Sequence, residues 1–304
     1  MFFGGRNWLC FLPRAFRGRI KVGAHSVTNP GREEGESMKN TIGLLGVGNM
    51  GTAILEGLFK KRVSSPRRVW VYDKMRAKES AFARKWGVRR AASAEDLARR
   101  VQWVILAVKP QDLAVTGAEL KPALTKKHGI ISILAGTPAA KIRRAVGAKP
   151  VIVRSMPNLG AKAGASMTAV TGSSRSALRI AKTIFDACGR TVVLPERFFD
   201  LVTAVSGSGP AYFFFLMEVL ARFGASHGLS RADAELLAVQ TASGAALLAA
   251  GGEASPQEWR ARVTSKKGTT EAAFKVMKRS GVEKILARAF QAALERGREL
   301  SRSV

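Results

Sequence analysis

A glycine-rich run beginning at residue 46 has the spacing of a dinucleotide-binding turn. It follows an apolar run that ends at Leu45, and an Ala- and Leu-rich helical pattern runs from Thr52 to Lys60. In such a turn Gly46 permits the tight bend, Gly48 lets the backbone approach a pyrophosphate, and Gly51 lets the helix pack on the strand. We expect a dinucleotide site here. The alternative is a glycine turn with only a structural role.

An acidic residue follows the second predicted strand. The strand Arg68–Tyr72 arrives about one helix later and ends at Asp73, where a ribose-binding acid is expected. Such an acid favours a free 2′-hydroxyl and hence NADH, whereas the basic residues Lys74, Arg76 and Lys78 favour the 2′-phosphate of NADPH. The residues alone leave both coenzymes open.

Two further segments have the chemistry of a binding site. The loop Val263–Thr270 offers hydroxyls, positive charge and the N–H groups of a helix start, which suit a carboxylate or phosphate. The alternative is that Thr269 or Thr270 merely caps that helix. The loop Ala107–Pro110 leaves a strand at its carboxyl end, where such sheets bind ligands. Lys109 is there either a coenzyme contact or a surface charge.

The elements that must position these residues fall into two regions. Strands and helices alternate from Lys39 to about Lys149, with later strands expected at Trp103–Val108, Gly129–Leu134 and Val151–Arg154. This pattern predicts an α/β fold with a Rossmann-type, doubly wound parallel sheet and helices on both faces. After about Pro195 the pattern is helical only. We therefore expect a dinucleotide-binding domain over 38–197 and a helical domain over 198–304.

The helical region has clear local signals. Ser206–Pro210 predicts a flexible turn, and the nearly all-apolar helix Ala211–Gly228 that follows it must be buried. Ser230 can cap the helix Arg231–Ala250, and Ser255 begins a capping box. More helices are expected at 270–279 and 282–300. This much apolar surface indicates dimerisation through helices, although a monomeric compact bundle stays open.

Composition limits the other classes of function. The formal charge of +28 would attract nucleic acid or anionic membranes, but the 50 Lys and Arg residues are spread along the chain without a basic run or an aromatic platform. We therefore expect no specific nucleic acid partner. The apolar run Ala211–Leu220 contains Glu218 and is too short to span a bilayer, so no membrane association is expected.

The remaining residue types give little evidence of a special site. Cys10 and Cys188 form no disulfide framework and no metal spacing, which favours a reducing, cytoplasmic location. The three histidines are isolated in sequence, and no metal is expected. Residues 1–37 read as a disordered leader. They are either an upstream mis-assigned start, which we prefer because Met38 leads directly into the first strand, or a basic targeting segment.

The motifs together resemble the pyrroline-5-carboxylate reductase family over about residues 38–300. They are Gly46–Gly51, Ala107–Pro110, Arg154–Asn158, Ala204–Tyr212 and Val263–Thr270. The first is shared by many dehydrogenases, whereas the last two together are highly specific to the family.

The resemblance implies reduction of 1-pyrroline-5-carboxylate to L-proline, the last step of proline biosynthesis, by hydride transfer from NADPH or NADH. Family usage favours NADPH. It also implies a homodimer, with a larger ring of dimers as in relatives. The alternatives are another imine or 3-hydroxyacid reductase of the same two-domain type, or a basic nucleic-acid-binding protein without catalysis.

The resemblance also implies the roles of individual residues. Thr270 would be the catalytic residue, as the hydroxyl that hydrogen-bonds the ring nitrogen. The substrate contacts would be Glu196, Glu253, Ser265, Thr269 and Thr270. The coenzyme contacts would be Gly46, Val47, Gly48, Asn49, Met50, Gly51, Asp73, Ala107, Val108, Lys109, Pro110, Ile133, Leu134 and Ala135.

The chain departs from the family pattern at three places. Lys267 stands where the family commonly has a glycine, and it adds a side chain where close backbone approach is expected. Ser93-Ala94 replaces an asparagine that would contact the adenosine ribose. Leu159-Gly160 stands where the family often has Thr-Pro.

Overall fold

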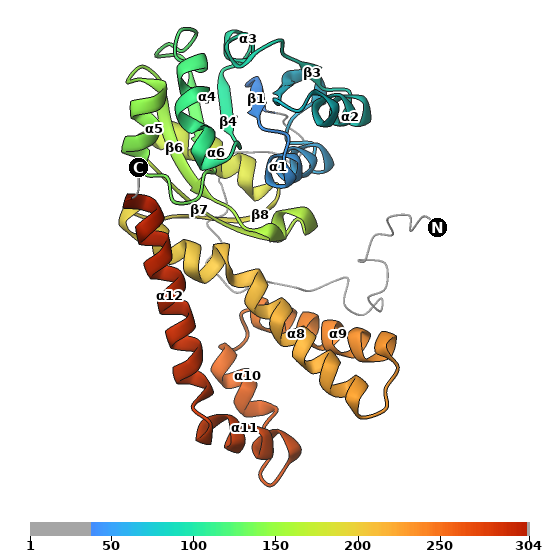
Figure 1. Ribbon diagram of the computed structural model, residues 1–304. Coiled ribbons are helices and arrows are strands. Elements are labelled where there is room, and N and C mark those ends of the chain that lie inside the picture. The colour runs from blue at the N-terminus through green and yellow to red at the C-terminus, as the bar shows by residue number, and fades with distance from the viewer. Residues whose placement is uncertain (1–37, 303–304) are drawn as a thin grey trace. The chain divides into compact units, whose positions relative to one another are not determined.

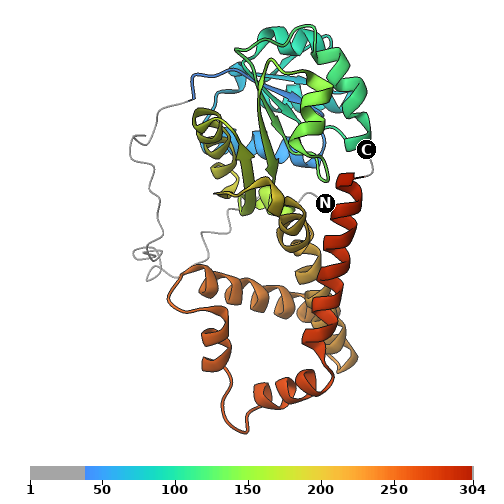
Figure 2. The ribbon, with the colours of Figure 1, turned by 90° about the vertical axis from the view of Figure 1, so that its left-hand side faces the viewer.

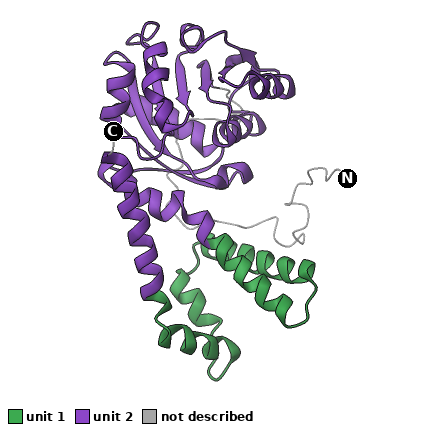
Figure 3. Cartoon of the chain, in the orientation of Figure 1, with its two compact units in different colours: residues 1–31, 213–283 green, residues 32–212, 284–304 purple. Residues whose placement is uncertain are grey.

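The computed structural model describes residues 38–302, and the predicted leader lies outside this range. The chain divides into two compact units, each described by itself (Figure 3). One comprises residues 32–212 and 284–304, of which 38–212 and 284–302 are described, and it is called here the sheet unit. The other, residues 213–283, is called the helical unit. The predicted division between residues 197 and 198 concerns domains rather than compact units and stays a prediction.

The sheet unit contains one eight-stranded sheet in the order β3-β2-β1-β4-β5-β6-β7-β8 (Figure 1). Its first five pairings are parallel, as the alternating pattern predicts. The strands are β1 Ile42–Leu45, β2 Val69–Tyr72, β3 Arg89–Arg90, β4 Trp103–Leu106, β5 Gly129–Ser132, β6 Val151–Met156, β7 Ser166–Gly172 and β8 Gly189–Val193.

Helices cover both faces of this sheet (Figure 2). They are α1 Asn49–Lys60, α2 Arg76–Trp86, α3 Ala94–Arg100, α4 Leu113–Leu120, α5 Ala139–Val146 and α6 Arg175–Asp186. Alternate residues of a strand enter different cores: Ile105 packs with α1, α2 and α6, whereas Val104 and Leu106 pack with α3, α4 and α5. The predicted doubly wound fold is confirmed.

Two details of the sheet differ from the prediction. Strands β4 and β5 end at Leu106 and Ser132, two residues earlier than expected in each case, because the chain turns into loops there. Strands β3, β7 and β8 were not expected, and β7 runs antiparallel to β6. Strand β8 lies at the sheet edge with no buried residue, so it lacks the apolar run that would reveal it.

Cys188, just before β8, is fully buried and forms no disulfide. Burial raises the pKa of its thiol to about 12, so the group stays protonated at neutral pH.

From residue 196 the described chain is helical. The elements are α7 Phe199–Val202, α8 Gly209–Ser226, α9 Arg231–Ala250, α10 Pro256–Arg262, α11 Thr269–Arg279 and α12 Val282–Arg302. The caps follow the sequence signals, since Ser230 accepts the N–H of Asp233 and Ser255 forms the predicted capping box with Glu258. The predicted flexible turn at Ser206 is wrong, because Thr203–Gly207 forms a π-helical turn that leads into α8.

The predicted burial of the apolar helix is also wrong for a single chain. Phe213, Phe215 and Phe223 of α8 are each about 64% exposed. By length and composition alone, the helical segment Glu196–Ser226 could cross a membrane, and 11% of its most apolar stretch is buried. The predicted run Ala211–Leu220 is thus part of a longer apolar helical segment, and one such segment is weak evidence for a membrane span.

Candidate functional site

Four loops of the sheet unit meet at one edge of the sheet because their strands are parallel neighbours. The glycine turn follows β1, Asp73 follows β2, Ala107–Pro110 follows β4 and Ile133–Ala135 follows β5. Backbone hydrogen bonds join them: Gly46 N–H donates to Tyr72 O over 2.9 Å, and Ala107 N–H donates to Leu45 O over 2.8 Å. The carboxyl ends of such strands are where this class of sheet binds ligands.

Each glycine of the turn has the geometry expected of it. Gly46 has a φ of +100°, and a Cβ there would lie 2.5 Å from the carbonyl oxygen of Ala107. A Cβ on Gly51 would lie 2.6 Å from the carbonyl oxygen of Gly46. Nothing lies within 4 Å of the Cβ position of Gly48, which caps α1 without a side-chain hydrogen bond. This open space at a helix start, where N–H groups point outward, fits a dinucleotide pyrophosphate.

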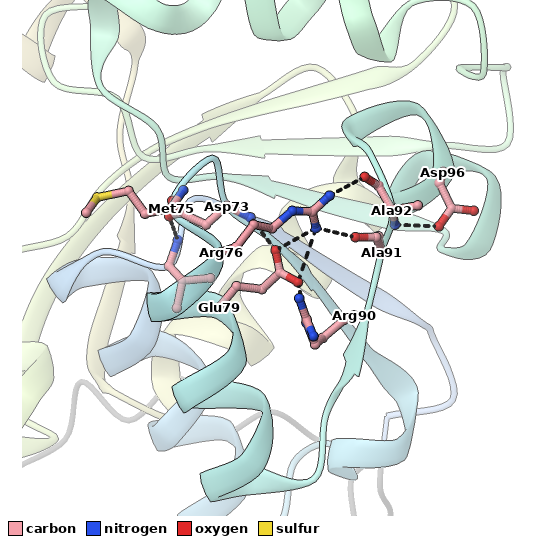
Figure 4. Close-up of polar contacts among 9 residues, drawn as sticks. Asp73, Met75, Arg76, Glu79, Arg90, Ala91, Ala92 and Asp96 are labelled. Atoms are coloured by element: carbon pink, nitrogen blue, oxygen red, sulfur yellow. Dashed lines mark hydrogen bonds and ion pairs between the residues drawn. The ribbon is translucent and has the colours of Figure 1, made fainter.

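Asp73 connects the glycine turn to the turn after β2. Its Oδ2 accepts the N–H of Val47 over 2.6 Å, and its Oδ1 accepts the N–H of Met75 over 2.7 Å. The N–H of Asp73 itself donates to Oε2 of Glu79 over 3.2 Å (Figure 4). The carboxylate is therefore fixed at the β2 end, where it could reach a ribose.

The predicted basic residues after Asp73 are partly engaged within the protein. Lys74 forms an ion pair with Asp112 at 3.3 Å. Arg76 donates to Glu79, to Ala91 O and to Ala92 O, and half of its side chain is exposed. Lys78 is exposed.

The other predicted coenzyme residues vary in exposure. Lys109 is exposed and precedes a short 3-10 helix that begins at Pro110. Asn49 is exposed and accepts from Lys162 Nζ over 3.3 Å. Leu134 is buried, so only its backbone could reach a ligand.

Glu196, a predicted substrate residue, is already bound to other groups of the sheet unit. Its Oε1 accepts the N–H of Ala139, the first residue of α5, over 2.7 Å and pairs with Arg154 Nη1 at 3.1 Å. Arg154 is 5% exposed and lies over the Phe199 ring. Glu196 thus neutralises a buried guanidinium, which the sequence did not reveal.

The motifs around Asn158 and Ser206 are in contact, since Asn158 Nδ2 donates to Ser206 O over 3.2 Å.

The predicted anion-binding loop lies in the helical unit. Gly268 is the N-cap residue of α11, and Thr269 and Thr270 are its first two helical residues. The alternative that one of these threonines starts the helix is therefore confirmed for Thr269, although the cap itself is Gly268. The cap is a glycine and makes no side-chain hydrogen bond, and Ser265 Oγ lies 2.3 Å from the position that a Cβ on it would take. Glu253, in the same unit, pairs with Arg262 at 2.7 Å.

Lys267 has a backbone conformation that favours glycine. Its φ of +62° is left-handed, a conformation that costs a non-glycine residue about 1–2 kcal/mol. Glu271 holds this turn by accepting the Lys267 N–H over 2.6 Å. That hydrogen bond, together with Lys275, keeps the pKa of Glu271 below its usual value.

Comparison with known proteins agrees with the geometry. Residues 196–300 match the family described as pyrroline-5-carboxylate reductase dimerisation, and residues 41–136 match NADP oxidoreductase coenzyme F420-dependent. The pyrroline-5-carboxylate reductase of Pseudomonas aeruginosa is 37% identical over 264 residues, which are 86% of this chain and 96% of that protein.

Solved structures give the same result. A pyrroline-5-carboxylate reductase from Coxiella burnetii superposes with a TM-score of 0.82 at 33% identity, over 88% of this chain and all of that one. The Plasmodium falciparum pyrroline carboxylate reductase with NADP bound gives a TM-score of 0.79 at 25% identity, with the same two coverages of 88% and 100%.

A pair of glycine substitutions separates folding from coenzyme binding. We expect Gly48→Ala to keep the melting temperature of the unsubstituted chain but to weaken NADPH binding about tenfold or more, because its Cβ fills only the space for the pyrophosphate. Gly46→Ala should lower the melting temperature, since its Cβ meets the Ala107 carbonyl. Calorimetric titration and thermal unfolding check both. Unchanged NADPH affinity in Gly48→Ala would contradict the site.

Lys267→Gly should raise the free energy of unfolding by about 0.5–1 kcal/mol, because glycine adopts the left-handed turn without strain. Lys266→Gly is the matched control: Lys266 does not have a positive φ, so this change should lower stability. Urea unfolding at one protein concentration measures both. Equal effects of the two substitutions would mean that the turn is not strained.

Proposed function

The chain belongs to the pyrroline-5-carboxylate reductase family, and from this membership we propose that it reduces 1-pyrroline-5-carboxylate to L-proline with NADPH. It is an NAD(P)H-dependent oxidoreductase of the C=N class. The observation that carries the proposed reaction is the match of residues 196–300 to the family described as pyrroline-5-carboxylate reductase dimerisation, together with the 37% identity to a relative of that name. The glycine turn, with open space over Gly48 and Asp73 beside it, supports the coenzyme. These residues fit a dinucleotide, whose reduced nicotinamide supplies the hydride when bound.

The chain's own residues have positioning work to do. A protonated cyclic imine is already electrophilic, so the protein must mainly hold it in place and satisfy its ring N–H. We assign the substrate carboxylate to the start of α11, with Ser265 and Thr269 as donors. Thr270 orients the ring nitrogen and relays a proton, since a lone hydroxyl is too weak an acid to do more. Glu196 in the sheet unit and Glu253 in the helical unit are each proposed as substrate contacts.

The helical unit is proposed to form a homodimer. Residues 196–300 match a dimerisation family, and α8 and α9 expose large apolar side chains in a single chain. Such a surface is covered in a stable protein. A second copy supplies that cover, rather than a bilayer or nucleic acid. A larger ring of dimers and a cytoplasmic location are parts of the same proposal.

Purified protein tests the reaction directly. We expect NADPH oxidation, followed by absorbance, on adding pyrroline-5-carboxylate, with proline as the product. Turnover with a 3-hydroxyacid and NADP+ instead would favour the related reductase class. If DNA shifts the protein's mobility at physiological salt and no substrate is turned over, the proposal fails.

Thr270→Ala should lower turnover about 10- to 100-fold, the value of one lost hydrogen bond to a charged group, without changing NADPH affinity. Thr264→Ala is the matched control in the same loop, because the Thr264 hydroxyl donates to Arg260 O and is not assigned to substrate. Steady-state kinetics and calorimetric titration provide the two readouts. If turnover and NADPH affinity fell together, Thr270 would have a folding role instead.

Phe214→Glu should convert the dimer to monomers, because it places a charge on the exposed apolar face of α8, where Phe214 is 56% exposed. Val115→Glu, at a 55% exposed position on α4, is the control and should leave the dimer intact. Light scattering measures the mass of each. A wild-type monomer, or a Phe214→Glu dimer, would contradict the proposed interface.

A further inference from the structure

Glu79 is a fully buried carboxylate that the proposed reaction does not use. It lies in the first turn of α2, and its side chain is 0% exposed. Its Oε1 accepts Arg90 Nε over 2.6 Å, and its Oε2 accepts Arg76 Nη1 and Asp73 N–H, each over 3.2 Å (Figure 4). Burying a carboxylate costs several kcal/mol unless it is paired, so this position is held by its three partners.

The first consequence of Glu79 concerns Asp73. Because the N–H of Asp73 points at Glu79, the backbone is fixed where β2 ends, and the carboxylate turns toward Val47 and Met75. Both carboxylate oxygens therefore already accept a backbone N–H. An acid engaged in this way has less capacity left for a free ribose 2′-hydroxyl.

The second consequence concerns Arg76. One guanidinium nitrogen contacts Glu79 and donates to Ala91 O over 3.1 Å, and the other donates to Ala92 O over 2.6 Å. The guanidinium also lies 5.1 Å from the centre of the Tyr72 ring. The side chain is nonetheless 50% exposed. Figure 4 shows this group held between Glu79 and the segment after β3. A guanidinium ordered in advance loses little entropy when it binds a phosphate.

We propose that Glu79 is a positioning residue for coenzyme selection. Glu79 holds the Asp73 backbone and the Arg76 guanidinium in place before the coenzyme binds. The ribose-binding position formed in this way favours an adenosine ribose that carries a 2′-phosphate over one with a free 2′-hydroxyl. The inference rests on the proposed use of NADPH. In the sequence, this arrangement is indicated by an arginine and a glutamate three residues apart, Arg76 and Glu79, in helix α2, which follows strand β2.

Glu79→Gln in the full chain tests the proposal with 2′,5′-ADP and 5′-AMP as probes in calorimetric titration. The dissociation constant of 5′-AMP divided by that of 2′,5′-ADP should fall about fivefold or more, because Arg76 loses its fixed position and 2′,5′-ADP binds more weakly. The affinity for 5′-AMP should stay within about twofold. The preference in kcat/KM for NADPH over NADH should fall in parallel, through KM and not kcat.

Glu79→Asp separates position from charge. This substitution keeps the carboxylate but shortens the side chain, so the preference for 2′,5′-ADP over 5′-AMP should fall as it does in Glu79→Gln. If Glu79→Gln does not fold, Glu79→Asp is the variant that tests the proposal. Glu56→Gln is the matched control. Glu56 is an ion-paired carboxylate of the same unit, bound to Lys85 at 2.8 Å, and no contact of Glu56 with Asp73, Arg76 or Glu79 is seen within the described residues, so the ratio should stay within about twofold.

Two results would overturn the proposal: an unchanged ratio in Glu79→Gln, which includes equal weakening of both nucleotides, or a ratio that rises because the basic charge is no longer balanced. A loss of selectivity in Glu56→Gln equal to that in Glu79→Gln would also overturn it. The nucleotide titrations do not depend on pyrroline reduction. A chain that binds both nucleotides but does not reduce the imine defeats the proposed function and leaves this test valid.

Discussion

Parallel pairing of β1 with both β2 and β4 is the constraint on which the candidate site depends. Residues Ile42 to Leu45 lie beside Val69 to Tyr72 on one side and beside Trp103 to Leu106 on the other. Because the strands are in register and run the same way, their loops emerge at one edge. The glycine turn, Asp73 and the Ala107 loop are therefore neighbours, although up to about 60 residues separate them along the chain.

At the carboxyl ends of these strands, carboxylates as well as backbone hydrogen bonds link the polar groups. Asp73 accepts two N–H groups from different loops. Glu79 accepts hydrogen bonds from the Asp73 backbone and from the Arg76 guanidinium and so fixes both. Such a network has few free rotamers, which is what a site that discriminates between two similar coenzymes requires. In the predicted anion-binding loop of the helical unit, Glu271 accepts the N–H of Lys267, a lysine in a turn suited to glycine.

The helical unit has the opposite character to the sheet unit. The sheet unit buries two continuous apolar cores, whereas α8 and α9 present Phe213, Leu236 and similar side chains outward. A helix as apolar as α8 needs cover, and the described part of one chain leaves large apolar side chains of this helix exposed. The match to a dimerisation family over these residues gives this surface its physical explanation.

The sequence by itself determined the features that depend on local chemistry. The glycine turn, the Ser230 cap, the Ser255 capping box and most helix limits follow from neighbouring residues, and the parallel sheet follows from alternation. Tertiary structure alone decided the rest. Strand β8 lacks a buried face to reveal it, and the antiparallel direction of β7 is set by its partners. Glu79 and Glu196 are paired with arginines of other elements, Arg90 of β3 and Arg154 of β6. Burial and pairing are properties of neighbours in space, which composition and spacing do not record.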